Sequence, residues 1–126
     1  MTAILVVDDE AIVRDSIKDW LHDIGGYEVH TAESGDEALE MIRERDFGVM
    51  ILDVRLPGKN GLAVLREAKA IKPQMKSIMI TAYPSAEGAA EAKSHGALDY
   101  LAKPVFPAKL ERLIRETLSK LENSLR

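Results

Sequence analysis

Short apolar runs alternate along the chain with longer segments in which apolar residues recur every three or four positions. The runs that predict strands lie at residues 4–7, 27–32, 49–52, 78–80 and 98–102. The inner runs are continuously apolar, as burial on both faces of a parallel sheet requires, whereas residues 27–32 alternate and suit an exposed edge. Strand-like and helix-like segments in alternation predict an α/β fold with a doubly wound parallel sheet.

The helical segments carry recognisable start and stop signals. The first helix has apolar residues at Val13, Ile17, Trp20, Leu21 and Ile24, and Gly25-Gly26 predicts its end. Ser34 and Glu37 have capping-box spacing for a second helix that closes near Asp46. A third helix is expected to contain Leu62, Leu65 and Ala68 and to break at Pro73, and a fifth to begin at Pro107 and run on to Arg126 without a stop signal.

The predicted fourth helix, residues 86–94, is rich in alanine and contains Gly88. A glycine inside a helix costs about 1 kcal/mol relative to alanine. With few large apolar side chains to hold it on the sheet, this helix is either a small, tightly packed element or a mobile one.

Composition limits the possible classes of protein. The chain has 126 residues, of which 46% are hydrophobic, so we expect one domain covering residues 1–126. A formal charge of −4 argues against direct contact with nucleic acid or with a membrane surface. The chain contains no cysteine, which excludes disulfides and thiolate metal sites. It has no apolar run of membrane-spanning length, and we expect a cytoplasmic location.

Polar side chains follow four of the predicted strands. Asp8 and Asp9 follow the first strand, Asp53 the third, Thr81 the fourth and Lys103 the fifth. The carboxyl ends of parallel strands meet at one edge of a sheet, where ligands gather. We therefore expect these side chains to form a single site.

The predicted site has the groups that phosphoryl transfer needs. Crowded carboxylates hold a proton or bind a cation, and ligation by oxygen alone favours a hard ion such as Mg²⁺, which also bridges to phosphate oxygens. The Asp53 carboxylate could attack phosphorus to give an acyl phosphate, with Lys103 and Thr81 stabilising charge on the phosphoryl oxygens.

The same residues are also compatible with roles that involve no phosphoryl transfer. Asp8 and Asp9 could cap the first helix, and Thr81 and Lys103 could be ordinary surface residues. A flavodoxin-like electron carrier would share the fold, but acidic residues after the first strand would repel its phosphate. An aspartyl phosphatase of the haloacid dehalogenase type would place Asp-x-Asp after that strand, where this chain has adjacent aspartates. The three histidines lack ligand spacing, and we assign them no role.

Four segments together resemble the receiver domain of two-component response regulators, and the likeness covers essentially the whole chain. They are Val6-Val7-Asp8-Asp9-Glu10, Asp53-Val54-Arg55-Leu56-Pro57-Gly58, Thr81-Ala82-Tyr83 and Gly96-Ala97-Leu98-Asp99-Tyr100-Leu101-Ala102-Lys103-Pro104. The resemblance implies a flavodoxin-like (βα)5 three-layer sandwich with strand order 2-1-3-4-5.

The resemblance also implies a role for each site residue. Asp53 would be the phosphoacceptor, and Lys103 and Thr81 would hold the phosphoryl oxygens. Asp8, Asp9, Asp53 and the backbone carbonyl of Arg55 would bind Mg²⁺, with Asp8 acting largely through water; Mn²⁺ could take its place.

A conformational switch is a further implication of the resemblance. Thr81 would shift toward the phosphoryl group and Tyr100 would turn inward, which changes the face made by the fourth helix, fifth strand and fifth helix. The Lys103–Pro104 peptide would be cis. Arg55 and Tyr83 occupy positions that in this family help to set the lifetime of the acyl phosphate. Val105-Phe106 departs from the commonest pattern, in which an aromatic follows Lys-Pro directly, and could shift the start of the fifth helix.

The function implied is that of a signalling phosphoacceptor and not of an enzyme. Its partners would be a sensor histidine kinase or a histidine phosphotransfer protein. We expect this chain to be the N-terminal receiver of a longer transcriptional regulator, whose output domain lies outside this chain and could bind DNA. A seam of Ile114, Leu118, Leu121 and Leu125 on the fifth helix suggests a homodimer when phosphorylated, or else one long helix packed on its own sheet. The alternative is a stand-alone receiver acting in a phosphorelay or by direct target binding.

Overall fold

The structure, a computed structural model, describes residues 2–124, with side chains described up to residue 120. The strands are β1 (Ala3–Val7), β2 (Glu28–Ala32), β3 (Val49–Asp53), β4 (Lys76–Thr81) and β5 (Asp99–Ala102). The helices are α1 (Ala11–Gly25), α2 (Gly35–Glu44), α3 (Gly61–Ile71), α4 (Ala86–Ser94) and α5 (Pro107–Ser124). The strands are parallel in the order β2-β1-β3-β4-β5, so the predicted fold is confirmed.

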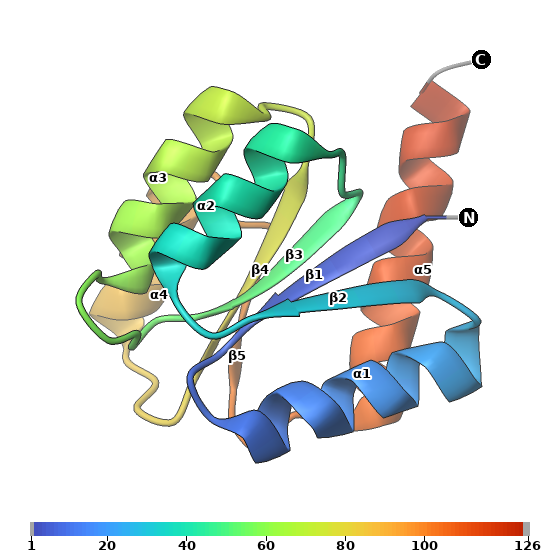
Figure 1. The fold of residues 1–126 in the computed structure, drawn as a ribbon, viewed down its shortest axis with the longest axis horizontal. Helices are drawn as coiled ribbons and strands as arrows, with labels where there is room; N and C mark the ends of the chain where they lie inside the picture. Colours follow the sequence, from blue (N-terminus) through green and yellow to red (C-terminus); the bar gives the residue numbers. More distant parts are fainter. Residues whose placement is uncertain (1, 125–126) are drawn as a thin grey trace.

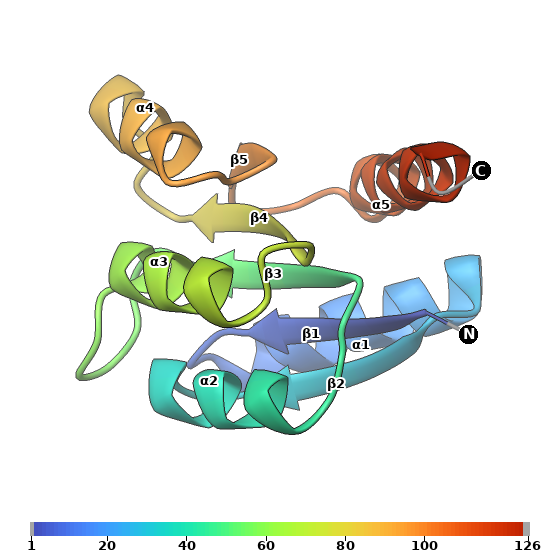
Figure 2. The same cartoon turned by 90° about the horizontal axis from the view of Figure 1, so that it is seen from above.

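The sheet lies between two helical layers. Helices α1 and α5 cover one face, and α2, α3 and α4 lie on the other (Figures 1 and 2). Successive strand residues point to opposite faces, which is why neighbours such as Ile51 and Leu52 belong to different cores. One core includes Leu39, Ile42, Leu52, Leu65 and Met79, and the other includes Ile17, Leu21, Ile51, Ile80 and Ile114.

Local signals set the helix ends largely as the sequence predicts. Gly26 adopts the left-handed conformation with φ 66° and ends α1, a conformation that favours glycine. The Ser34 side chain accepts a hydrogen bond from the Glu37 amide at the start of α2. Helix α5 begins at Pro107. Ile24 was expected on the apolar face of α1, but it is 55% exposed because it lies at the last turn, beyond the buried Leu21.

Helix α5 packs on its own sheet. Ile114 is fully buried and Leu118 packs against the same core. Ile114 is therefore unavailable to an exposed coiled-coil seam, because its own sheet covers it, and Leu118 is partly covered by the same core. The Leu121 side chain and Leu125 lie outside the described residues.

Helix α4 is attached mainly through small residues, with Ala92 as its buried position. A Cβ atom at Gly88 would lie 2.6 Å from the Tyr100 hydroxyl, so the glycine is needed for close approach of that ring. The Tyr100 hydroxyl accepts a hydrogen bond from the Ser85 amide over 3.3 Å. Gly88 therefore has a packing role, because its lack of a side chain leaves a notch in α4 that the Tyr100 ring occupies.

Among the helices of residues 2–124, none combines the length and the apolar character needed to cross a membrane.

Candidate functional site

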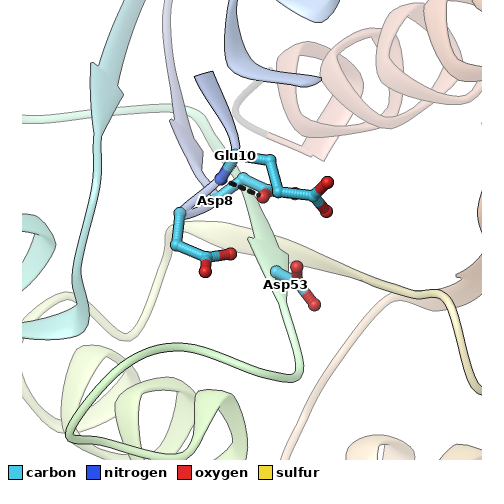
Figure 3. Close-up of side chains that lie close together, drawn as sticks. Asp8, Glu10 and Asp53 are labelled. Carbon is cyan, nitrogen blue, oxygen red and sulfur yellow. Dashed lines mark hydrogen bonds between the residues drawn. The ribbon is translucent and has the colours of Figure 1, made fainter. Parts of the chain in front are cut away.

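The residues predicted to meet at the strand ends do so around the Lys103 ammonium. Lys103 Nζ donates a hydrogen bond to Asp53 Oδ2 over 2.7 Å and lies 2.8 Å from Asp8 Oδ2. Its distance to Glu10 Oε1 is 3.3 Å. Figure 3 shows Asp8 and Glu10 on the segment after β1, beside Asp53 on β3. One cation thus faces three carboxylates from two strand ends.

The site is buried at its base and open at its rim. The side chains of Asp8 and Asp53 are 0% and 6% exposed, that of Lys103 is 13% exposed and that of Glu10 is 57% exposed. A buried charge needs a partner because desolvation disfavours the ionised form. The ammonium supplies that partner for Asp53 and Asp8, while a small part of the Asp53 side chain remains exposed.

Burial and the neighbouring charges oppose each other in setting the pKa of Asp53. Burial raises the pKa of Asp53, and so does the negative charge of Asp8. The hydrogen bonds that Lys103 and the Arg55 amide donate to Asp53 lower this pKa. The net effect is a raised pKa, because burial is the largest cause. For Lys103, burial alone would lower the pKa, but contacts with Asp53 and Asp8 outweigh it and raise the pKa. The fold therefore holds a charged ammonium beside a carboxyl that is costly to ionise.

The carboxylates form a ligand set suited to a hard cation. One oxygen from each of Asp8, Asp9, Glu10 and Asp53 lies within 4.8 Å of the others. Asp8 Oδ2 is buried and lacks a hydrogen bond within the described part of the chain, its compensation being the nearby ammonium. An all-oxygen donor set with an incompletely satisfied buried carboxylate fits Mg²⁺.

Glu10 is the member of this cluster to which sequence reasoning gave no role. It is the N-cap residue of α1 and makes no side-chain capping hydrogen bond there. Instead its amide donates to Asp8 Oδ1 over 2.9 Å, the dashed line in Figure 3. Of the two aspartates that could have capped α1, only Asp8 makes a hydrogen bond of this kind within the described residues, when its side chain accepts from the Glu10 amide. The run of three acidic residues was the signal that could have identified Glu10.

Thr81, the last residue of β4, and Arg55, in the loop between β3 and α3, border the site. Thr81 is buried, and its Oγ1 accepts a hydrogen bond from the Tyr83 amide over 3.0 Å, while its carbonyl accepts one from the Lys103 amide over 2.8 Å. The Arg55 guanidinium lies 4.2 Å from the centre of the Tyr83 ring, a cation–π contact that joins the β3–α3 and β4–α4 loops. The Lys103–Pro104 peptide is cis.

Gly61 fixes the loop that follows Asp53. A Cβ atom at this position would lie 2.2 Å from the Asp53 carbonyl oxygen and 2.8 Å from Val54 Cα, both of them backbone atoms. Because backbone cannot rotate away as a side chain can, we expect Gly61→Ala to lower the free energy of unfolding by about 2–3 kcal/mol. Urea unfolding would measure this. Gly48→Ala is the comparison, since its Cβ would meet the ends of the Thr2 and Leu118 side chains, which can move; an equal loss in both variants would contradict the explanation.

Comparison with known proteins agrees with this geometry. The family model for the response regulator receiver domain matches residues 4–115. The chain is 41% identical over 124 residues to the transcriptional regulatory protein ZraR of Escherichia coli K12, a match that covers 92% of this chain and 27% of that protein. It is 36% identical to protein-glutamate methylesterase/protein-glutamine glutaminase 3 of Rhodospirillum rubrum, covering 96% of this chain and 34% of that protein.

A solved structure gives the same result for nearly the whole chain. The CheY-like response regulator receiver domain protein of Methanospirillum hungatei JF-1 superposes with a TM-score of 0.93 at 36% identity, and the match covers 98% of both chains. Receiver domains of this kind are signalling phosphoacceptors and not classical enzymes, and in general they bind Mg²⁺ at an acidic pocket. Fold, strand-end site and sequence relatives agree, and the chain belongs to the family of response regulator receiver domains.

Proposed function

We propose that this chain accepts a phosphoryl group on Asp53 in a Mg²⁺-dependent transfer from a phosphohistidine. The donor is a sensor histidine kinase or a histidine phosphotransfer protein. The observation that carries the proposal is the buried Asp53 carboxylate, held 2.7 Å from the Lys103 ammonium and within one cluster of four carboxylates. An Asp53 oxygen forms the new bond to phosphorus, and the bond from phosphorus to the imidazole nitrogen breaks. The leaving imidazole keeps that electron pair and takes a proton from water.

Lys103 can neutralise negative charge at the site both before and after this transfer. Before transfer its ammonium compensates Asp53 and Asp8, and afterwards it can donate to a phosphoryl oxygen from nearly the same place. Thr81 ends the neighbouring strand and would donate its hydroxyl once it leaves the Tyr83 amide. When bound, Mg²⁺ would neutralise charge on the phosphoryl oxygens; Asp8, Asp9, Asp53 and the Arg55 carbonyl would hold it, and Mn²⁺ could replace it.

The switch that we propose couples the phosphoryl group to the α4-β5-α5 face. Movement of Thr81 toward the phosphoryl group would change the β4–α4 loop, which ends at the helix that contacts Tyr100. Tyr100 is held to the start of α4 by one long hydrogen bond, and the buried side chain of α4 is the small Ala92. A weakly anchored helix is the element that a local charge change can most readily reposition.

The chain spans about a quarter to a third of the length of its two curated relatives, ZraR and the methylesterase/glutaminase. One of them is named as a transcriptional regulator and the other as an esterase and glutaminase, so receivers of this kind occur with different outputs. We propose that residues 1–126 form the receiver of a transcriptional regulator that dimerises when phosphorylated, because the larger identity is to the transcriptional protein. The alternative is a stand-alone receiver in a phosphorelay.

A groove beside the site would receive the protein donor. A cavity of about 360 Å³ lies between α1 and the β5–α5 loop, lined by Ile12, Val13, Trp20, Val105 and other residues, and it shares Glu10 and Lys103 with the site. We infer that a protein bringing a phosphohistidine to Asp53 would cover this rim, because the cavity shares Glu10 and Lys103 with the site. Ile12 is 76% exposed and offers an apolar contact there.

We therefore expect Ile12→Glu to slow phosphoryl transfer from a histidine kinase about tenfold or more, because a buried unpaired charge at an interface is costly. Transfer from acetyl phosphate, which needs no protein interface, should stay close to native. Radiolabel transfer with both donors checks this. Equal slowing with the two donors would mean that the substitution damages the site itself.

The direct experiment on the proposed function is intact mass measurement after incubation with acetyl phosphate, with and without MgCl₂. An adduct of one phosphoryl group that requires Mg²⁺ supports the proposal. If there is no adduct, and beryllofluoride also fails to bind, the fold serves only as an interaction module.

A further inference from the structure

Arg14 on α1 reaches back to the backbone of the acidic segment that follows β1. Its Nη1 donates a hydrogen bond of 2.7 Å to the backbone carbonyl oxygen of Asp8. Arg14 is half-buried, and its own amide donates to the Glu10 carbonyl over 3.1 Å. The guanidinium and the first turn of α1 thus hold the Asp8-Asp9-Glu10 segment from one side.

Arg14 contacts the acidic segment at the Asp8 carbonyl group. Strand β1 ends at Val7, so this carbonyl lies beyond the strand, and Asp8 itself is 0% exposed. Buried carbonyl groups need a donor, and Arg14 supplies it. The carbonyl also belongs to the peptide plane that joins Asp8 to Asp9. Rotation of that plane would turn Asp9 relative to Asp8, whose amide is fixed by a 3.2 Å hydrogen bond to Ala32.

We propose that Arg14 is a positioning residue for the cation site: by holding the Asp8 carbonyl, it fixes the direction in which Asp9 presents its carboxylate beside Asp8 and Asp53. The inference rests on the proposed function, because it takes these carboxylates as the Mg²⁺ ligands. Partners that orient metal ligands in this way typically change metal affinity by about 10- to 100-fold when they are removed.

Charge alone would give the opposite result. Arg14 is a cation near a site for another cation, so its removal should tighten Mg²⁺ binding if it acted only through electrostatics. Loss of positioning should weaken binding. The sign of the change therefore distinguishes the two roles, and high salt screens the electrostatic part while leaving the positioning part.

The test is isothermal titration of the whole chain with MgCl₂, in native form and as Arg14→Gln, Arg14→Lys and Lys18→Gln. Lys18 is exposed on the same helix, one turn further along, so Lys18→Gln is the matched control for loss of one positive charge. We expect Arg14→Gln to weaken Mg²⁺ binding about tenfold. In roughly 0.5 M KCl the binding should still be weakened about threefold or more. Lys18→Gln should leave Mg²⁺ binding unchanged or slightly tighter.

Arg14→Lys keeps the charge, but its ammonium nitrogen is one bond closer to Cα than Nη1 is. We therefore expect it to hold the Asp8 carbonyl less well and to bind Mg²⁺ more weakly than native. Its result stands even if Arg14→Gln fails to fold, which thermal unfolding without Mg²⁺ would reveal. Native or tighter affinity in Arg14→Lys, or in a folded Arg14→Gln, overturns the inference. If the native chain does not bind Mg²⁺, or binds equally well as Asp53→Asn, the proposed function has failed instead.

Discussion

Asp53→Asn is expected to abolish the phosphoryl adduct formed with acetyl phosphate and Mg²⁺. The amide oxygen is a poor nucleophile, whereas the carboxylate of Asp53 lies where the ammonium and a cation can neutralise the incoming phosphoryl group. Intact mass measurement of native and variant chains under the same conditions checks this. Asp36→Asn is the matched control, because Asp36 is 86% exposed and pairs with Lys59 at the surface, so its adduct should be native in amount.

Retention of a full adduct in Asp53→Asn would mean that another residue accepts the phosphoryl group, and it would contradict the proposed chemistry.

The same variant also reports on the electrostatics of the site. The pKa of Asp53 is raised in the folded chain, so ionisation of this carboxyl destabilises the fold as pH rises above its ordinary value of 3.8. Without Mg²⁺, Asp53→Asn should therefore lose less stability than the native chain between about pH 4 and pH 7.

The second large effect is expected for Lys103→Met, which leaves Asp53 and Asp8 buried without their cation. Removing one partner of a buried ion pair costs about 3–5 kcal/mol, and the open rim of this site places the expected loss near the lower end, about 3 kcal/mol at about pH 7.5 without Mg²⁺. Urea unfolding gives the value. Because the pKa of Lys103 is raised by these contacts, the native ammonium contributes fully at this pH and up to alkaline pH.

The pH dependence of Lys103→Met provides its internal check. Loss of the Lys103 hydrogen bond removes a contact that lowers the pKa of Asp53, so the remaining carboxyls would take up a proton more readily. The difference from native should shrink from about pH 7.5 to about pH 4.5, and saturating MgCl₂ should reduce it as well. Lys59→Met breaks surface bridges to Glu67 and Asp36 and should change stability little at either pH. Losses of similar size in both variants would argue against a special role for the buried cluster.

Much of the fold was predictable because burial imposes periodicity on the sequence. The runs ending near Val7, Leu52 and Ile80 are continuously apolar since both faces of the inner strands are covered, and the edge strand β2 alternates. Stop and start signals at Gly26, Ser34 and Pro107 marked the helix ends within a few residues. Strand ends were therefore visible in the sequence, and with them Asp53, Thr81 and Lys103.

Contacts made by loops and by helix faces were not predictable in the same way. The 55% exposure of Ile24, the burial of Ile114 by its own sheet and the notch that Gly88 leaves for Tyr100 all depend on how far each helix is rotated against the sheet. Helical periodicity identifies an apolar stripe, but it does not say which part of the stripe the neighbouring layer covers.

The amino-acid sequence by itself determined the order of strands and helices, the edge of the sheet where the polar residues gather, and the carboxylate, hydroxyl and ammonium available there. Tertiary structure alone decided that Glu10 joins the cluster, that Arg14 holds the Asp8 carbonyl and that Arg55 stacks on Tyr83. The physical reason is the range of the forces involved. Burial and capping act within a few residues and leave a pattern in the sequence, whereas loop direction and side-chain contacts follow from packing between segments far apart in the chain.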